Sequence, residues 1–217
     1  VELSCGEVII GGIAKGSGMI MPNMATMLGF VTTDAKISRS LLQTSLKEAV
    51  NDSFNKISVD GETSTNDMVL MLANGMSEVE ITEDSEDYLI FTSALKDLSI
   101  KMAKAIVFDG EGATKFITVN IKNAPTEKDA NLIAKAIANS PLVKTAINGG
   151  DPNWGRVISA ASSCGAEIKP ANCTLYFNDL AVLEPGFKID YSEEEAAKIF
   201  AMKNFVITLD LNDGKEN

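Results

Sequence analysis

Apolar residues recur every three or four positions along one stretch of this chain, and that period limits its fold more than any other feature. It predicts a long amphipathic helix that ends before Gly110. Such a helix needs a sheet to pack on, and the continuous apolar run at residues 68–72 predicts a strand that is buried on both sides. The periodic positions are Tyr88, Phe91, Leu95, Leu98, Met102 and Ile106.

Further strands and helices are expected on both sides of that pair, which together indicate an α/β protein. Residues 7–14 and 28–33 are expected to be strands, and Ser38 is a candidate N-cap of a helix. From Lys115 the pattern changes and a second unit is expected. Its predicted elements are a strand to Lys122, a helix opened by Thr126, a short helix near 157–161, a hairpin of Thr174–Phe177 with Leu180–Leu183, a helix opened by Ser192 and a strand at 205–211.

The charge balance restricts the partners of the protein. Its 217 residues include 19 Lys and Arg against 30 Asp and Glu, which gives a formal net charge of -11. This charge repels nucleic acids and anionic membranes, so neither is an expected partner. No apolar run approaches the roughly 20 residues of a membrane span, and the sequence lacks the layout of a secretion signal, so a cytoplasmic location is expected.

The cysteines do not suggest a disulfide framework or a metal site. Cys5, Cys164 and Cys173 are odd in number, widely spaced and free of any C-x-x-C pair. We therefore expect reduced, buried thiols and no metal.

The chain contains no histidine, so it cannot complete a nucleophile that relies on a histidine base. The run from Lys15 to Thr26 places a hydroxyl directly after the small residue Ala25. We interpret Thr26 as a nucleophile that cleaves the Ala25–Thr26 bond through an N-to-O acyl shift and then uses its own α-amine as base. Such an amine has an ordinary pKa of about 7.7–8.0, whereas lysine lies near about 10.4. The plainer alternative is a threonine that enters a strand.

Three other clusters allow a structural interpretation as well as a functional one. Glu111 lies between two glycines, a pattern that suits a helix C-cap followed by an exposed turn. The run from Gly149 to Arg156 holds the only tryptophan and suits either a structural loop or the wall of a pocket. The four polar residues from Ser64 to Asp67 either line a site or cap and turn the chain.

These motifs, in this order, resemble the ornithine acetyltransferase family, the bifunctional glutamate N-acetyltransferases of arginine biosynthesis. The resemblance covers nearly the whole chain, as the end of an α subunit followed by most of a β subunit. The matching motifs are Lys15-Gly16-Ser17-Gly18-Met19, Pro22-Asn23-Met24-Ala25-Thr26-Met27-Leu28, Ser64-Thr65-Asn66-Asp67, Asp109-Gly110-Glu111-Gly112-Ala113-Thr114-Lys115 and Gly149 to Arg156.

The resemblance implies self-cleavage between Ala25 and Thr26, which gives α and β subunits that assemble as an α2β2 heterotetramer. Thr26 would then be the catalytic nucleophile, and Lys15, Thr26 and Glu111 would contact substrate. The implied reaction moves acetyl from N-acetylornithine through Thr26 to glutamate and needs no cofactor or metal. The use of acetyl-CoA as a co-substrate is left open.

The implied fold is a layered αββα sandwich, analogous to N-terminal nucleophile hydrolases but differently connected, followed by a smaller α/β domain. Its parts would be residues 1–25 at the end of the α subunit, 26–115 as the nucleophile domain and 116–217 as the smaller domain, truncated at its end.

Two parts of the family pattern have no match in this sequence. One is the threonine-glycine pair of the oxyanion hole, so the remainder of the α subunit is an expected partner. The other is a C-terminal strand, and Asn212-Asp213-Gly214 is a hairpin signal whose second strand is then expected beyond Asn217. Two other functions stay open: a self-cleaving aminopeptidase or amidase of related fold, and an unprocessed, non-enzymatic subunit.

Overall fold

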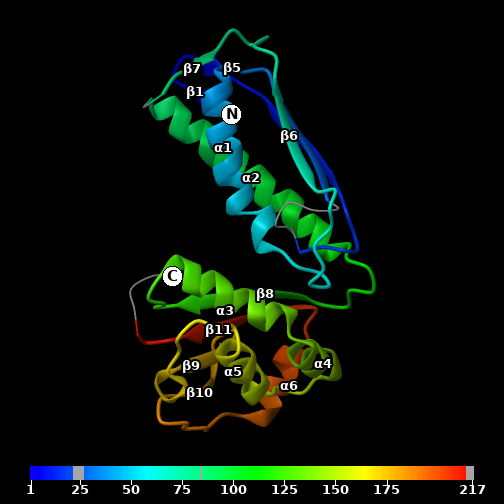
Figure 1. Cartoon of the computed structure of the whole chain (residues 1–217), viewed down its shortest axis with the longest axis vertical. Coiled ribbons are helices and arrows are strands. Elements are labelled where there is room, and N and C mark those ends of the chain that lie inside the picture. Colours follow the sequence, from blue (N-terminus) through cyan, green and yellow to red (C-terminus); the bar gives the residue numbers. More distant parts are fainter. Residues whose placement is uncertain (22–26, 84, 214–217) are drawn as a thin grey trace. The chain divides into compact units, whose positions relative to one another are not determined.

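The computed structural model describes residues 1–21, 27–83 and 85–213, which form two compact units, Val1–Ala113 and Thr114–Asn217 (Figure 1). Each unit has a hydrophobic core of its own. Both units combine strands with helices, which confirms the predicted α/β class. The predicted limits 1–25, 26–115 and 116–217 combine a cleavage site after residue 25 with a domain boundary after residue 115, and they stay a prediction.

The first unit is built on a three-stranded sheet of β3 (Ile10–Lys15), β4 (Leu28–Thr33) and β6 (Met68–Ala73), in the order β3-β4-β6. β3 runs antiparallel to β4, and β4 runs parallel to β6. Gly12 allows a helix to approach β3 closely, because a Cβ there would lie 2.8 Å from the sulfur of Met102. The backbone of β3 at Gly12 therefore lies directly against the side chain of Met102.

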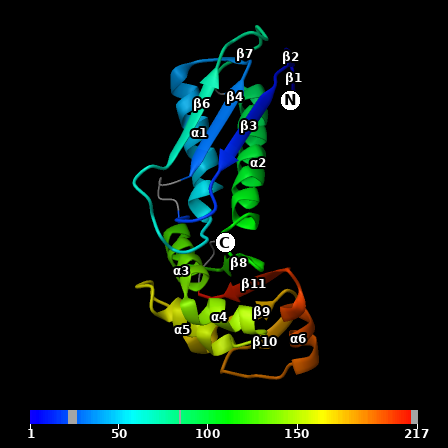
Figure 2. The ribbon, with the colours of Figure 1, turned by 90° about the vertical axis from the view of Figure 1, so that its right-hand side faces the viewer.

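Two helices, α1 (Arg39–Asn51) and α2 (Glu86–Phe108), cover one face of this sheet (Figure 2). The hydroxyls of Ser38 and Ser85 cap their first turns, as serine does at many helix N-termini. The predicted long helix is confirmed, including its end before Gly110. Its apolar stripe packs on the sheet and on α1 to form the core of the unit.

The second face of the sheet is not covered by any described element of this unit. Along β6, Val69 and Met71 are buried, whereas Met68, Leu70 and Leu72 are 39%, 40% and 55% exposed. The prediction that this strand is buried on both sides is therefore wrong, because the two helices pack on only one face. We call the other side the open face; its large apolar residues are Ile13, Leu28, Phe30, Met68, Leu70 and Leu72.

Short elements complete the first unit. Two pairs of two-residue strands are present, β1 antiparallel to β2 and β5 parallel to β7. Their bounds, with that of a 3-10 turn, are β1 (Glu2–Leu3), β2 (Gly6–Glu7), β5 (Lys36–Ile37), η1 (Phe54–Lys56) and β7 (Glu80–Ile81).

The turn between β1 and β2 is tied to α2. The carboxylate of Asp87 accepts hydrogen bonds from the Ser4 amide and the Ser4 hydroxyl, both at 2.7 Å, and these bonds lower the pKa of Asp87. Cys5 in the same turn is exposed, Cys164 is half-buried and Cys173 is buried, all as free thiols. The prediction of buried cysteines is therefore wrong for Cys5.

The second unit is built on a four-stranded sheet in the order β10-β9-β11-β8. β11 runs parallel to β8 and antiparallel to β9. β9 and β10 form the predicted hairpin, in which Asn178 adopts a positive φ of 50°. The strands are β8 (Phe116–Lys122), β9 (Thr174–Phe177), β10 (Leu180–Leu183) and β11 (Asn204–Asp210).

The position of β11 contradicts the hairpin predicted at its end. Asn212 has the expected positive φ of 53°, and Gly214 lies outside the described residues. However, β11 is an inner strand whose two edges are already paired with β9 and β8. A following strand has no free edge of β11 to pair with, so the local turn signal does not predict the sheet correctly.

Helices pack on this sheet and begin at the predicted caps. Thr126 and Ser192 accept hydrogen bonds from the amides of Asp129 and Glu195, at 3.1 and 3.2 Å. No helix in the described ranges is long and apolar enough to cross a membrane. The helices are α3 (Glu127–Asn139), α4 (Pro141–Gly149), α5 (Trp154–Ser162), η2 (Pro170–Asn172) and α6 (Glu193–Ala201).

Candidate active site

Three strand termini that are distant in sequence lie side by side at one end of the first sheet. Lys15 is the last residue of β3, Leu28 the first of β4 and Met68 the first of β6. The register pairs Lys15 with Leu28 and Leu28 with Met68, so the three residues form one row across the sheet. Leu28 is two residues after Thr26 in the chain. The pairing therefore places Lys15 beside the segment that leads out of the predicted cleavage site.

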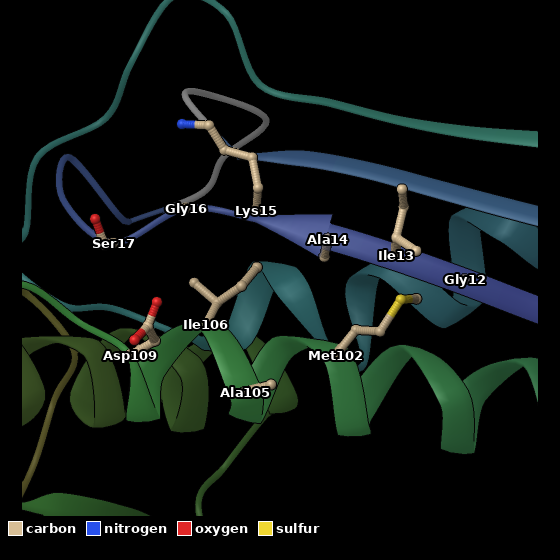
Figure 3. A pocket seen from close by; sticks show the side chains of 10 residues that line it. All are labelled: Gly12, Ile13, Ala14, Lys15, Gly16, Ser17, Met102, Ala105, Ile106 and Asp109. Carbon is tan, nitrogen blue, oxygen red and sulfur yellow. The ribbon is translucent and has the colours of Figure 1, made fainter.

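The side chain of Lys15 extends away from α2. Figure 3 shows Lys15 and Ile13 pointing to one side of β3 while Ala14 points toward α2 on the other, as expected from alternation along a strand. Lys15 is exposed. Its ammonium therefore lies at the end of the open face.

The loop after β3 is held in place by polar residues that precede β6. The carboxylate of Asp60 accepts hydrogen bonds from the amides of Met19 and Ile20, at 2.5 and 3.0 Å. The hydroxyl of Thr63 donates to the carbonyl of Met21 at 3.0 Å. The chain is thus fixed immediately before residues 22–26.

The chain is fixed equally firmly after those residues. Met27 is 1% exposed, its amide donates to the Asp67 carboxylate, and its carbonyl accepts from the Met68 amide at 2.9 Å. The second carboxylate oxygen of Asp67 is buried and has no hydrogen-bond partner among the residues that the structure describes. Burial raises the pKa of Asp67 above its ordinary value, and the hydrogen bond from Met27 opposes that shift.

Glu111 is attached to the same loop from the end of α2. Its amide donates to the carbonyl of Ser17 at 2.7 Å. Its carboxylate lies against Gly18, because a Cβ on that glycine would be 2.8 Å from Glu111 Oε2. The side chain is exposed. The helix C-cap interpretation also holds in part, since Asp109 caps α2, but the following turn is bound to the loop rather than free in solvent.

Ala25 and Thr26 lie outside the described residues, so the predicted nucleophile and cleavage site are located only by their place in the chain. They fall between Met21 and Met27, which are both anchored by the segment that leads into β6. Lys15 and Glu111, the other two predicted site residues, both belong to this end of the unit. The roles assigned to all four residues stay predictions.

A cavity of about 500 Å³ lies on the other side of β3, between this strand and α2 (Figure 3). Its polar groups include Ser17 and Asp109, and Met102 and Ile106 give it an apolar wall. The Lys15 side chain points away from this side of the strand. We therefore do not assign the cavity to the chemistry of Thr26.

Sequence reasoning missed the contact of Asp67 with Met27. Asp67 is one of four polar residues for which the sequence predicts either a turn or part of a site, and the turn is present, since the Asn66 amide donates to the Ser64 hydroxyl. The only available signal was position, because Asp67 directly precedes a strand that pairs with the strand after Thr26.

The loop from Gly149 to Arg156 belongs to the second unit and has a structural role there. Asn153 caps α5, and the Arg156 guanidinium donates to the carbonyl of Leu142 at 2.8 Å and to the hydroxyl of Thr145 at 3.1 Å. Arg156 thus joins α5 to α4. Within the described ranges, no cluster of three or more Cys, Asp or Glu residues is arranged to hold a metal ion.

Comparisons with known proteins give one consistent result. The model of the ArgJ family matches residues 1–217. The arginine biosynthesis bifunctional protein ArgJ of Chlorobium chlorochromatii is 54% identical over 214 residues, which are 99% of this chain and 50% of that protein. The protein of the same name from Thermotoga neapolitana is 50% identical over 215 residues, covering 97% of this chain and 54% of the relative.

A solved structure agrees with these relatives. The crystal structure of arginine biosynthesis bifunctional protein ArgJ from Bacillus halodurans has a TM-score of 0.82 at 40% sequence identity, covering 86% of this chain and 89% of that chain. The chain spans about half the length of the curated relatives it matches.

Proposed function

Because this chain belongs to the ArgJ family, we propose that it forms the central part of a glutamate N-acetyltransferase of arginine biosynthesis. The full-length enzyme moves an acetyl group from N-acetylornithine to glutamate and releases ornithine. It works in the cytoplasm and requires no cofactor or metal. Acetyl-CoA is a second acetyl donor to be tested.

The enzyme first cleaves itself. The Thr26 hydroxyl oxygen attacks the Ala25 carbonyl carbon, and the carbon–nitrogen bond breaks as the new ester forms. Water then hydrolyses the ester, which leaves a carboxylate on Ala25 and a free α-amine and hydroxyl on Thr26.

Acetyl transfer uses the same hydroxyl in two steps. Thr26 attacks the acetyl carbonyl of N-acetylornithine, ornithine leaves as an amine, and acetyl-threonine remains. The amine of glutamate then attacks this ester, which yields N-acetylglutamate and restores the hydroxyl. The α-amine of Thr26 accepts and returns the proton in each step because its ordinary pKa, about 7.7–8.0, is close to neutral pH. Lys15 and Glu111 bind the charged groups of the amino-acid substrates.

The observation that carries this proposal is that Lys15 and Glu111 both lie at the end of the first unit where the chain enters and leaves residues 22–26. Lys15 pairs with the strand that follows Thr26, and Glu111 lies against the loop that precedes Ala25. A cation and an anion at the same end of one unit suit a substrate that carries both an amine and a carboxylate.

The open face supports the finer fold. Six large apolar residues on one side of a sheet are unusual unless another layer covers them. We propose that a sheet from the remainder of the α subunit packs there and completes a layered αββα sandwich, analogous to N-terminal nucleophile hydrolases but differently connected. Two such αβ pairs would form the α2β2 heterotetramer.

The test is an assay of the full-length protein with N-acetylornithine and glutamate. We expect release of ornithine and a transient acetyl mass on the peptide that begins with Thr26. The Thr26→Ala variant should remain one chain and show neither signal, while Thr26→Ser keeps a hydroxyl and should cleave. An active parent whose Thr26 peptide never carries acetyl would contradict the assigned nucleophile.

The same assay separates the alternatives. An amidase would release acetate from N-acetylornithine at the same rate with or without glutamate, and an aminopeptidase would release the first residue of a peptide instead. A non-enzymatic subunit would keep an intact Ala25–Thr26 bond, which the intact mass of the freshly folded protein reveals.

A further inference from the structure

The first step of the proposed function lacks a base. The α-amine of Thr26 serves as proton acceptor only after cleavage, because before cleavage its nitrogen is part of the Ala25–Thr26 peptide bond. A peptide nitrogen is not basic, and the chain has no histidine. Some other group must take the hydroxyl proton when the chain first cuts itself.

We propose that Asp67 is this proton acceptor, an inference that rests on the proposed self-cleavage. One oxygen of its carboxylate binds the Met27 amide, whose nitrogen is bonded to the carbonyl carbon of Thr26. The other oxygen is buried and unpartnered within the described part of the chain. The Thr26 hydroxyl oxygen is four covalent bonds from the Met27 nitrogen, so Asp67 holds the residue bonded directly to the one that must lose a proton.

The geometry at Met27 is rigid enough for this role. Asp67 and Met68 are consecutive, and they hold the amide and the carbonyl of Met27 at the same time. Met27 itself is 1% exposed. The carboxylate therefore keeps its position relative to Met27, the residue bonded to Thr26. Its burial also raises its pKa, which makes it a stronger base than an exposed carboxylate.

Neighbouring carboxylates fit the role less well. Asp60 already accepts hydrogen bonds from the amides of Met19, Ile20 and Glu62. Glu111 is exposed and lies against Gly18, on the side of the loop that precedes residues 22–26. Asp67 is the carboxylate that combines a buried free oxygen with a direct bond to the residue after Thr26.

The step balances without another reactant. Asp67 takes the proton from the Thr26 hydroxyl as the oxygen bonds to the Ala25 carbonyl carbon. When the carbon–nitrogen bond breaks, Asp67 returns the proton to the departing Thr26 nitrogen. The products are the ester, a neutral amine and the original carboxylate, ready for hydrolysis of the ester by water.

The test follows cleavage of the full-length Asp67→Asn variant by intact mass over time. The asparagine carbonyl still accepts the Met27 amide, so the variant removes the base and keeps the contact. We expect cleavage to slow by about 100-fold or more, the usual effect of losing a general base. The matched control is Glu62→Gln, which removes one charge from an exposed side chain in the segment that leads into β6 and should cleave within about three-fold of the parent.

Hydroxylamine at neutral pH identifies the step that fails, because under that condition it splits an ester but leaves the peptide bonds intact. If Asp67 acts in the acyl shift, no ester forms in Asp67→Asn, and hydroxylamine should not restore cleavage. Cleavage on adding hydroxylamine would show that the ester forms without Asp67 and would overturn the proposal. Cleavage of Asp67→Asn at the parent rate would overturn it as well.

A form of the protein made as two polypeptides, already divided between Ala25 and Thr26, distinguishes loss of the base from a folding defect. The segment ending at Ala25 and the chain beginning at Thr26 are expressed together as separate polypeptides, both carrying the full length outside residues 1–217. Here the freed amine is present from the start, so we expect Asp67→Asn to assemble and to transfer acetyl. Loss of assembly or of all transfer would assign Asp67 a structural role instead. If the parent itself neither cleaves nor transfers acetyl, the proposed function fails independently of Asp67.

Discussion

The open face gives a quantitative prediction about the full-length protein. Ile13 and Leu72 are 72% and 55% exposed, so most of their apolar surface remains to be covered. Complete burial of such a side chain is worth about 1.5–3 kcal/mol, and the uncovered fractions of the two residues together correspond to about 2–4 kcal/mol. If another sheet covers this face, the double variant Ile13→Thr/Leu72→Thr should lower the free energy of unfolding by that amount. Threonine is chosen because it is β-branched and itself favours strands.

The assay is denaturant unfolding of the full-length protein, with the midpoint and slope measured for both proteins. Leu89→Gln is the matched control, since Leu89 is 68% exposed on α2, away from the open face. A substitution that stays exposed changes stability by less than about 0.5 kcal/mol. A double variant within that limit, equal to the control, would refute the idea that this face is covered.

Three further predictions concern single residues. Gly18→Ala should displace the Glu111 carboxylate and raise the KM for N-acetylornithine by about five-fold, or about 1 kcal/mol, with an unchanged unfolding midpoint. Thr126→Ala should lower the unfolding free energy by about 1 kcal/mol and Thr126→Ser by less than half of that, because serine still caps α3. Burial raises the pKa of Cys173 to about 11, so at pH 8 only about a thousandth is thiolate; iodoacetamide should modify exposed Cys5 in the native protein and Cys173 only after denaturation.

The helices could be predicted from the sequence because their signals are local. The apolar stripe of α2 and the caps at Ser38, Thr126 and Ser192 each lie within a few turns of the element that they define. The hairpin of β9 and β10 is local in the same sense, with Asn178 at its turn.

The errors arose where distant segments decide the outcome. The apolar run of β6 correctly indicates a strand. It does not indicate whether residues 1–217 also supply a second layer that covers the other face of the sheet. The turn signal at Asn212 is real, yet pairing of β11 with β8 and β9 leaves no edge for a hairpin.

The candidate site likewise combines residues that local motifs indicate with contacts that depend on distant segments. Lys15 and Glu111 were predicted from the resemblance, and their approach to one loop depends on the pairing of β3 with β4 and on the end of α2. The sequence does not distinguish Asp67 from other polar turn residues, because its position beside Met27 depends on the parallel pairing of β4 with β6.

The place of β3 at one edge of its described sheet has a consequence for a chain that has been cut. β3 pairs with β4 along its full length, from Ile10 to Lys15, and Val8 and Ile20 on either side of it are fully buried. Scission after Ala25 would therefore leave two polypeptides that migrate separately in detergent but elute as a single particle under native conditions. Refolding of that nicked material would become bimolecular, with a rate that depends on protein concentration, whereas the uncut precursor would refold at a rate independent of dilution.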